Sequence, residues 1–168
     1  MEPGELAALL AAAAVHELGH LAAIWLLGLR IRQIRAELTG LCILYAGESD
    51  PVTDAAVAAA GPFFGAGLTV LGLLAVERTG HVWFHRLAAM SGALTVCNFL
   101  PVSPLDGGRI GESFFCALLG TAGGLRISAA VGMAVSVSLV LLGGALMAGG
   151  RGWTVFFFGA ALLIRQFC

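Results

Sequence analysis

The sequence has very little charge and no lysine: 11% of its 168 residues are charged, and all nine basic residues are arginine. A soluble domain carries about 25% charged residues. With 59% apolar residues and a mean hydropathy of +0.95, the chain cannot cover a globule in water. This composition excludes a soluble enzyme and a disordered tail. The net charge of −1 and the lack of a basic patch exclude a nucleic-acid binder.

Cysteine spacing and aromatic content exclude further classes. The four cysteines form no CxxC pair, so neither a disulfide framework nor a zinc ribbon is indicated. Aromatic residues are only 8%, whereas the 24 glycines favour closely packed membrane helices over a β-barrel. Glu2 and Glu5 stand where a signal peptide has basic residues, so we expect the first apolar run to remain in the mature chain.

Apolar runs predict about five membrane spans, since a spanning helix needs about 20 residues. We expect them at Leu6–Leu29, Val52–Val76, Val82–Leu100, Ile127–Ala148 and Trp153–Phe167. The last crosses only if it tilts or if the membrane thins locally. Asp50 is the expected N-cap of the second span, with Pro51 at its first position and Asp54 in its first turn. Gly111–Leu119 is too short to span and predicts an interfacial or partly buried helix.

The segment Arg30–Asp50 mixes polar and apolar residues and is not a long apolar run. Its apolar residues are bounded by Thr39–Gly40 and Gly47, which predicts a short β-hairpin. Open strands are not tolerated in lipid, so this ribbon must pack against helices or lie at the interface. The predicted fold is therefore an all-α polytopic membrane protein, a single domain over residues 1–168, with a short membrane-associated β-ribbon between its first two spans.

The arginines predict the orientation in the membrane. Three of them directly follow the first span, which favours a cytoplasmic location for that end. Threading five spans from there places six arginines in or near the cytoplasm and three outside; the six are Arg30, Arg32, Arg35, Arg109, Arg126 and Arg165, and the three are Arg78, Arg86 and Arg151. The N-terminus is then outside and the C-terminus cytoplasmic.

The first span carries His16-Glu17-Leu18-Gly19-His20 near its middle. Positions i and i+4 share a helix face, so both imidazoles can reach one metal ion with Glu17 beside them. Zinc suits two histidines, and the carboxylate can accept the proton of a zinc-bound water. Ionisable groups are costly at mid-membrane. A hydrolytic site is therefore favoured over the alternative that the three side chains merely satisfy one another in the bundle.

A catalytic zinc site has three protein ligands, so another helix must supply the third. Asp106 is the candidate, because it follows a stretch broken by Pro101 and Pro104 and precedes Gly107–Gly108. Such a stretch can enter the membrane where it is buried in protein or lines a water-filled cavity. The alternative is an aspartate that caps a turn at the surface.

These motifs together resemble the site-2 protease family of intramembrane zinc metalloproteases. The resemblance rests on HELGH within a span, Ala60-Gly61-Pro62 within the next, and Asn98-Phe-Leu-Pro-Val-Ser-Pro-Leu-Asp-Gly-Gly-Arg after a third. Their order is closest to the sporulation branch, whose member activates a sigma-factor precursor. The likeness implies that His16, His20 and Asp106 hold Zn2+ and that Glu17 is the general base. Asn98 would hold the substrate or stabilise the oxyanion.

The resemblance covers residues 6–109 well and the remainder, 110–168, in outline: a short interfacial helix and two further spans. It implies a membrane-embedded or membrane-tethered protein substrate, presented in extended form by the ribbon. An inhibitory membrane protein and a bacterial inner membrane, of the cell or the forespore, are also implied. The site would lie about 16 Å below the cytoplasmic surface and open toward it. Sporulation relatives usually carry a helix before the HExxH helix and a nucleotide-sensing domain; we expect neither here, and no soluble regulatory domain.

Other interpretations stay open. His81 and His85 are also four residues apart, but no glutamate follows His81, which favours an interfacial belt over a second metal site. Gly61 and Gly65 are expected to pack against the HExxH helix. A divalent-metal transporter is disfavoured because the last two spans hold no carboxylate. A catalytically inactive relative that binds a substrate is a further alternative.

Overall fold

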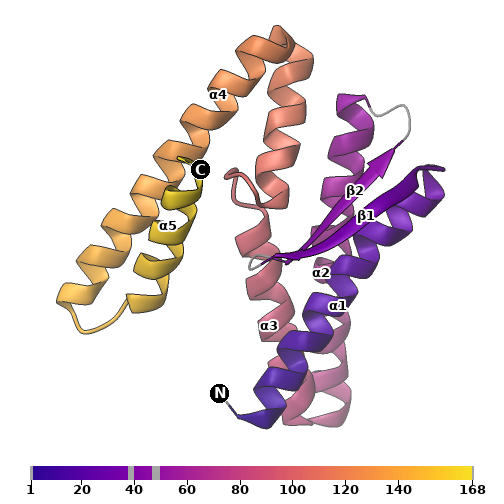
Figure 1. The fold of residues 1–168 in the computed structure, drawn as a ribbon. Coiled ribbons are helices and arrows are strands. Elements are labelled where there is room, and N and C mark those ends of the chain that lie inside the picture. The colour runs from indigo at the N-terminus through magenta and orange to yellow at the C-terminus, as the bar shows by residue number, and fades with distance from the viewer. Residues whose placement is uncertain (1, 38–39, 47–49, 168) are drawn as a thin grey trace. The chain divides into compact units, whose positions relative to one another are not determined.

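A computed structural model describes residues 2–37, 40–46 and 50–167, which form five helices and two strands (Figure 1). In chain order these are α1 Pro3–Leu26, β1 Arg30–Glu37, β2 Gly40–Ala46, α2 Pro51–Thr79, α3 Val82–Asn98, α4 Asp106–Ala148 and α5 Trp153–Arg165. Thr39 and Gly47, where we expected the ends of a strand, lie outside the described residues. The chain divides into two compact units, Met1–Phe99 and Leu100–Cys168.

The first unit packs α1, α2 and α3 against one another through small side chains. The buried residues include Ala8 and Ala12 of α1, Ala58 of α2 and Ala88 of α3. Small residues let membrane helices approach closely, so that van der Waals contacts and hydrogen bonds hold them together. The Ser91 hydroxyl on α3 donates one such bond to the carbonyl oxygen of Gly65 on α2, at 2.8 Å.

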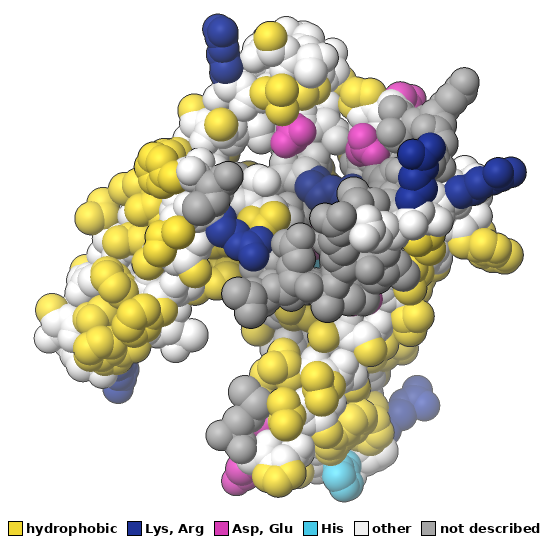
Figure 2. Space-filling model, viewed as in Figure 1, with side chains coloured by type: hydrophobic (Ala, Val, Ile, Leu, Met, Phe, Trp, Pro, Cys, Tyr) yellow, Lys and Arg dark blue, Asp and Glu magenta, His cyan; other side chains and the backbone are white. Residues whose placement is uncertain are grey.

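Large apolar side chains point outward instead of inward. Trp25 is 79% exposed and Phe63 is 77% exposed, and Figure 2 shows hydrophobic side chains over much of the visible surface. Water would not tolerate this arrangement, whereas lipid is as apolar as the side chains themselves. Among the described residues, three helices are long and apolar enough to span a membrane: Pro3–Leu26, Pro51–Thr79 and Asp106–Ala148. The protein is a helical membrane protein.

The five-span count stays a prediction. Helix α3 has 17 residues and α5 has 13, so α5 is about 20 Å long. That is shorter than the hydrocarbon core, which is about 30 Å thick. Helix α3 also ends at Asn98, earlier than the expected Leu100.

The start of α2 confirms the predicted cap. Asp50 is the N-cap residue, and its carboxylate accepts a hydrogen bond from the Thr53 amide at 2.7 Å. Pro51 is the first helical residue, and Asp54 lies in the first turn. The bond from Thr53 lowers the pKa of Asp50 below its ordinary value, because it stabilises the charged form.

Strands β1 and β2 form an antiparallel hairpin between α1 and α2. Their register pairs Arg30 with Ala46 and Glu37 with Gly40, with one irregularity between Ile31 and Gln33. The chain therefore passes directly from the helix that carries the HExxH motif into an extended segment. The association of this ribbon with the membrane stays a prediction.

Helix α4 of the second unit differs from the sequence prediction. It begins at Asp106, earlier than the expected short helix Gly111–Leu119, and it is interrupted at Gly120, where φ is 74° and ψ is 164°. A Cβ at Gly124 would collide with the backbone of Cys116, so the chain reverses there. Two antiparallel arms result, residues 106–119 and 121–148 (Figure 1). The short helix expected at Gly111–Leu119 is thus part of the first arm of a hairpin. The chain reverses at Gly120 because, among the glycines of α4, only Gly120 has a positive φ.

Helix α5 returns along the second arm of α4. A Cβ at Gly159 of α5 would lie 2.8 Å from Leu139, and one at Gly132 would lie 3.3 Å from the Gln166 side chain. The end of α5 is therefore level with Gly132, twelve residues beyond the reversal at Gly120. Its Leu162 packs into a core with Val102 and Leu105, which precede α4.

Replacing Gly120 by alanine should destabilise the protein, whereas replacing Gly111 by alanine should not. A Cβ would meet open space at both positions, but only Gly120 has a positive φ. We expect Gly120→Ala to lower the free energy of unfolding by about 1–3 kcal/mol. Gly111→Ala, inside the first arm, should raise it by up to about 1 kcal/mol. Unfolding in mixed micelles titrated with SDS measures both, and equal effects would contradict the reversal at Gly120.

Candidate metal centre

His16 and His20 lie one turn apart on α1, and both are buried, with 4% and 8% of their surfaces exposed. Their Nε2 atoms are 3.3 Å apart. The rings meet edge to face, with centroids 4.9 Å apart. The i, i+4 spacing therefore brings two imidazole nitrogens to one point inside a membrane helix bundle, as the sequence predicts.

A backbone carbonyl on α2 orients His20. The His20 Nδ1 lies 2.8 Å from the carbonyl oxygen of Val57. A carbonyl oxygen only accepts, so Nδ1 must carry the hydrogen, and the Nε2 of the neutral ring then presents its lone pair. Histidines that bind metals almost always use their second nitrogen in this way, which sets the tautomer and the ring orientation.

The Ala60-Gly61-Pro62 segment gives the histidine pair its space. A Cβ at Gly61 would collide with His20 Nε2 and would lie 2.9 Å from His16 Nε2. From the other side, a Cβ at Gly19 would lie 2.7 Å from the carbonyl oxygen of Ala60. Helices α1 and α2 therefore cross at two glycines, directly beside the imidazoles. Gly61 packs against the HExxH helix as predicted, whereas a Cβ at Gly65 would collide with Thr95 of α3.

The histidine pair fits a zinc ion. Zinc binds histidine nitrogen at about 2.0–2.1 Å and prefers tetrahedral geometry, which places two nitrogen ligands about 3.3–3.4 Å apart. The Nε2 atoms of His16 and His20 are already separated by 3.3 Å. The separation of the two nitrogens therefore matches that of two ligands of one zinc ion.

Glu17 and Asp106 are the carboxylates that the sequence singles out. Glu17 is half-buried at the middle of α1. Asp106 is the first residue of α4 and is only 8% exposed, so the alternative of a surface turn cap is wrong. A Cβ at Gly108 would lie 2.5 Å from the Ser103 nitrogen, so a glycine is needed where the chain folds tightly before the helix. The roles of both carboxylates stay predictions.

Asn98 is the last residue of α3 and is half-buried. Its side-chain amide donates to the carbonyl oxygen of Leu94 on its own helix, at 3.0 Å. This bond orients the side chain at the point where α3 gives way to the irregular stretch. Its role toward a substrate or an oxyanion stays a prediction.

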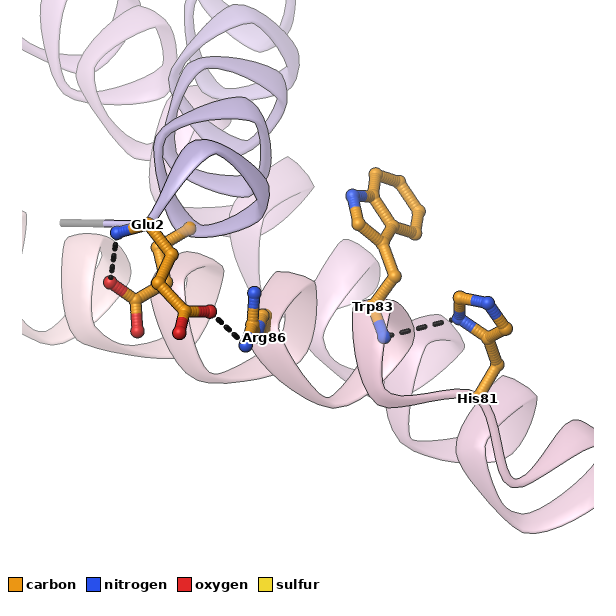
Figure 3. Close-up of polar contacts among 5 residues, drawn as sticks. Glu2, His81, Trp83 and Arg86 are labelled. Carbon is orange, nitrogen blue, oxygen red and sulfur yellow. Dashed lines mark hydrogen bonds and ion pairs between the residues drawn. The ribbon is translucent and has the colours of Figure 1, made fainter.

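His81 has a structural role at the start of α3. It is the N-cap residue, and its Nδ1 accepts a hydrogen bond from the Trp83 amide at 3.2 Å (Figure 3). Nearby, Arg86 forms an ion pair with Glu2, which joins the beginnings of α3 and α1. An exposed ring that caps a helix needs no metal to explain it.

The Val57 carbonyl, the most specific partner of the site, is not predictable from the sequence. A backbone oxygen carries no residue-type signal, so only the fold reveals it. The capping box at the start of α1, formed by Glu2 and Glu5, does have a sequence signal, which is the spacing of the two glutamates around Pro3.

Comparison with known proteins relates the fold to solved structures. No protein-family model matches the sequence, and no curated protein matches it. The Site-2 Protease from Methanocaldococcus jannaschii is similar in structure, with a TM-score of 0.75 and 20% sequence identity. The match covers 95% of this chain and 74% of that chain. The protein described here therefore shares the fold of that protease.

Gly61→Ala should weaken zinc binding, because the added methyl group would displace the imidazoles of His16 and His20. We expect a loss of affinity of about 10-fold or more, the size seen when the surroundings of metal ligands are changed. Gly67→Ala is the control, since a Cβ there meets open space on the same helix. Competition with a chromophoric chelator in detergent measures both. Equal affinities in the two variants would contradict the crossing described above.

Proposed function

We propose that this protein is an intramembrane zinc metalloprotease of the site-2 type. The observation that carries the proposal is the buried pair of histidines on a membrane helix, 3.3 Å apart at Nε2, with His20 oriented by the Val57 carbonyl. Hydrolysis that depends on zinc needs such ligands beside a carboxylate that can act as a base, and Glu17 follows His16 directly. The shared fold with a solved site-2 protease supports the same function.

His16 and His20 would hold zinc through Nε2, and Asp106 would supply the third ligand from the start of α4. When bound, zinc acts as a Lewis acid that acidifies water and polarises a peptide carbonyl. Glu17 accepts the proton of the attacking water and delivers it to the leaving amine nitrogen. Two features favour Asp106 as the third ligand: it is buried, and the broken stretch before it lets a helix begin with a carboxylate.

The substrate class follows from the surroundings of the site. A protease whose outer surface is apolar meets proteins that are embedded in or tethered to the membrane. The ribbon β1–β2 follows α1 and offers extended backbone to which a substrate strand can pair. Within this class, the resemblance to the sporulation branch alone implies a sigma-factor precursor, and an inhibitory membrane protein would regulate access.

The arginine distribution supports a cytoplasmic opening of the site in a bacterial inner membrane. Arg30 and Arg32, directly after α1, are exposed and would lie at the cytoplasmic surface. The N-terminus is then outside. This orientation brings water to the histidine pair from the cytoplasmic side.

Glu17→Gln should retain zinc and abolish proteolysis, because the amide cannot accept the proton. General-base loss typically costs about 10²–10⁴-fold in rate. Cleavage of a co-expressed membrane-tethered reporter, together with zinc content by mass spectrometry, measures both effects. The matched control is Glu77→Gln, an exposed carboxylate at the far end of α2, which should cleave like the parent. Comparing membrane proteomes of cells with the parent and with Glu17→Gln would identify the substrate as a retained precursor.

An unchanged cleavage rate in Glu17→Gln would overturn the mechanism. Zinc uptake by vesicles that contain the parent, without cleavage of any retained precursor, would favour transport instead. Zinc-loaded parent protein that neither cleaves nor transports would indicate a binding relative.

Asp106→Asn should weaken zinc binding, since an amide oxygen is a poorer ligand than a carboxylate. We expect affinity to fall by at least about 10-fold, with the histidine pair still intact. Glu112→Gln is the control, because it neutralises a half-buried carboxylate on the same arm of α4. Zinc affinities from chelator competition provide the measurement. Equal affinities for parent and Asp106→Asn would mean that another group completes the site.

A further inference from the structure

The carbonyl oxygen of Ser103 receives a long-range hydrogen bond from the end of α5. The Gln166 side-chain amide donates to it at 3.0 Å, across 63 residues of sequence. Ser103 lies three residues before Asp106, in the irregular stretch that joins α3 to α4. This bond therefore links the end of α5 to the segment that determines where α4 begins.

Short-range bonds alone do not anchor the irregular stretch. The Val102 amide donates to Leu100 and the Leu105 amide donates to Val102, at 2.7 and 2.8 Å. These turns give the stretch its local shape but tie it to nothing else in the second unit. Its apolar anchor is the cluster of Val102 and Leu105 with Leu162 of α5, against which Val135 and Leu139 of α4 also pack. Its polar anchor is the bond from Gln166 at the end of α5.

Gln166 lies beside an apolar stretch of α4. Helix α5 ends level with Gly132, twelve residues from the reversal at Gly120, which is about 18 Å along the arm. The helix α4 is strongly apolar, and a polar side chain beside such a helix is stabilised when it is hydrogen-bonded. The Ser103 carbonyl supplies that partner and so links Gln166 to the irregular stretch.

We propose that Gln166 is a positioning residue that holds the Asp106-bearing segment in place for metal binding. The inference rests on the proposed function, since it assumes that Asp106 is a zinc ligand. Gln166 does not touch the metal. It acts through the Ser103 carbonyl, and the buried contact of Leu162 with Val102 and Leu105 acts alongside it. The last helix is then part of the metal centre's support.

Gln166→Leu tests this inference, because leucine keeps most of the volume and removes the donor. We expect the zinc affinity to fall about 10-fold, the size typical for partners that orient metal ligands. The absorption spectrum of the cobalt(II)-substituted protein should also shift toward that of Asp106→Asn. Ser103→Ala is the matched control, since the acceptor is a backbone oxygen that this change leaves in place; its affinity and spectrum should equal the parent's.

Gln166→Asn is a second, more conservative variant in case Gln166→Leu fails to fold. Its amide is one methylene too short to keep the 3.0 Å bond, but it remains polar, so an intermediate affinity is expected. SDS unfolding midpoints of the metal-free proteins identify any variant that is globally destabilised. Unchanged zinc affinity and cobalt spectrum in both Gln166 variants would overturn the inference and leave the proposed protease function intact.

A parent protein that binds no zinc would instead overturn the proposed function. Hydrogen exchange of residues 100–109 in the metal-free proteins then still tests the anchor. Faster exchange in Gln166→Leu than in Ser103→Ala would support the anchoring by Gln166. Equal exchange in the two would contradict it.

Discussion

The hydrogen bond between His20 and the Val57 carbonyl is the interaction on which the candidate metal centre depends. It joins α1 to α2 in the part of the bundle where both helices carry glycine, and it determines which nitrogen of His20 faces His16. Without it, the ring could rotate or adopt the other tautomer. The close crossing at Gly19 and Gly61 makes the bond geometrically available, because larger residues would hold the helices apart.

Lipid as the surrounding solvent explains both the packing and the rarity of polar groups. The helices of the first unit meet through alanine, glycine and hydroxyl groups, while Trp25 and Phe63 face outward. In such a bundle a hydrogen bond offsets the cost of burying a polar side chain, and two side chains of the first unit have one to a backbone carbonyl: His20 to that of Val57 and Ser91 to that of Gly65. A polar side chain without a packing role is therefore a strong indicator of chemistry.

The second unit shows how irregular backbone is supported beside membrane helices. Prolines end α3 and prevent the helix from continuing, and the chain then turns tightly before Asp106. This stretch is held by apolar packing on α4 and α5 and by the bond from Gln166, instead of by regular backbone pairing. The hairpin of α4 extends from the same point and reverses at Gly120. Helix α5 is too short to cross the bilayer by its length alone. Its contacts with the irregular stretch give it a structural role.

Local features were predictable from the sequence. The membrane class follows from composition, the pairing of His16 with His20 follows from the 3.6-residue helical period, and the cap at Asp50 follows from residue type. Each depends on residues within a few positions of one another. The positions of α1, α2 and the ribbon also follow from runs of apolar residues and the turn signals between them. The start of α4 was misplaced, because glycines at 107, 108 and 111 look like breaks but adopt helical angles.

Only the tertiary structure decided the contacts that orient the site. The Val57 carbonyl and the Ser103 carbonyl are backbone atoms, which every residue type has, so no motif could indicate them. The reversal at Gly120 depends on which of several glycines takes a left-handed conformation, and the packing of the two arms decides that. The sequence by itself determined which side chains are the candidates for chemistry, because their residue types and spacing are visible in it. The fold decided how these side chains are held. The atoms that hold them are backbone carbonyl oxygens, which are distant in sequence and are the same in every residue type.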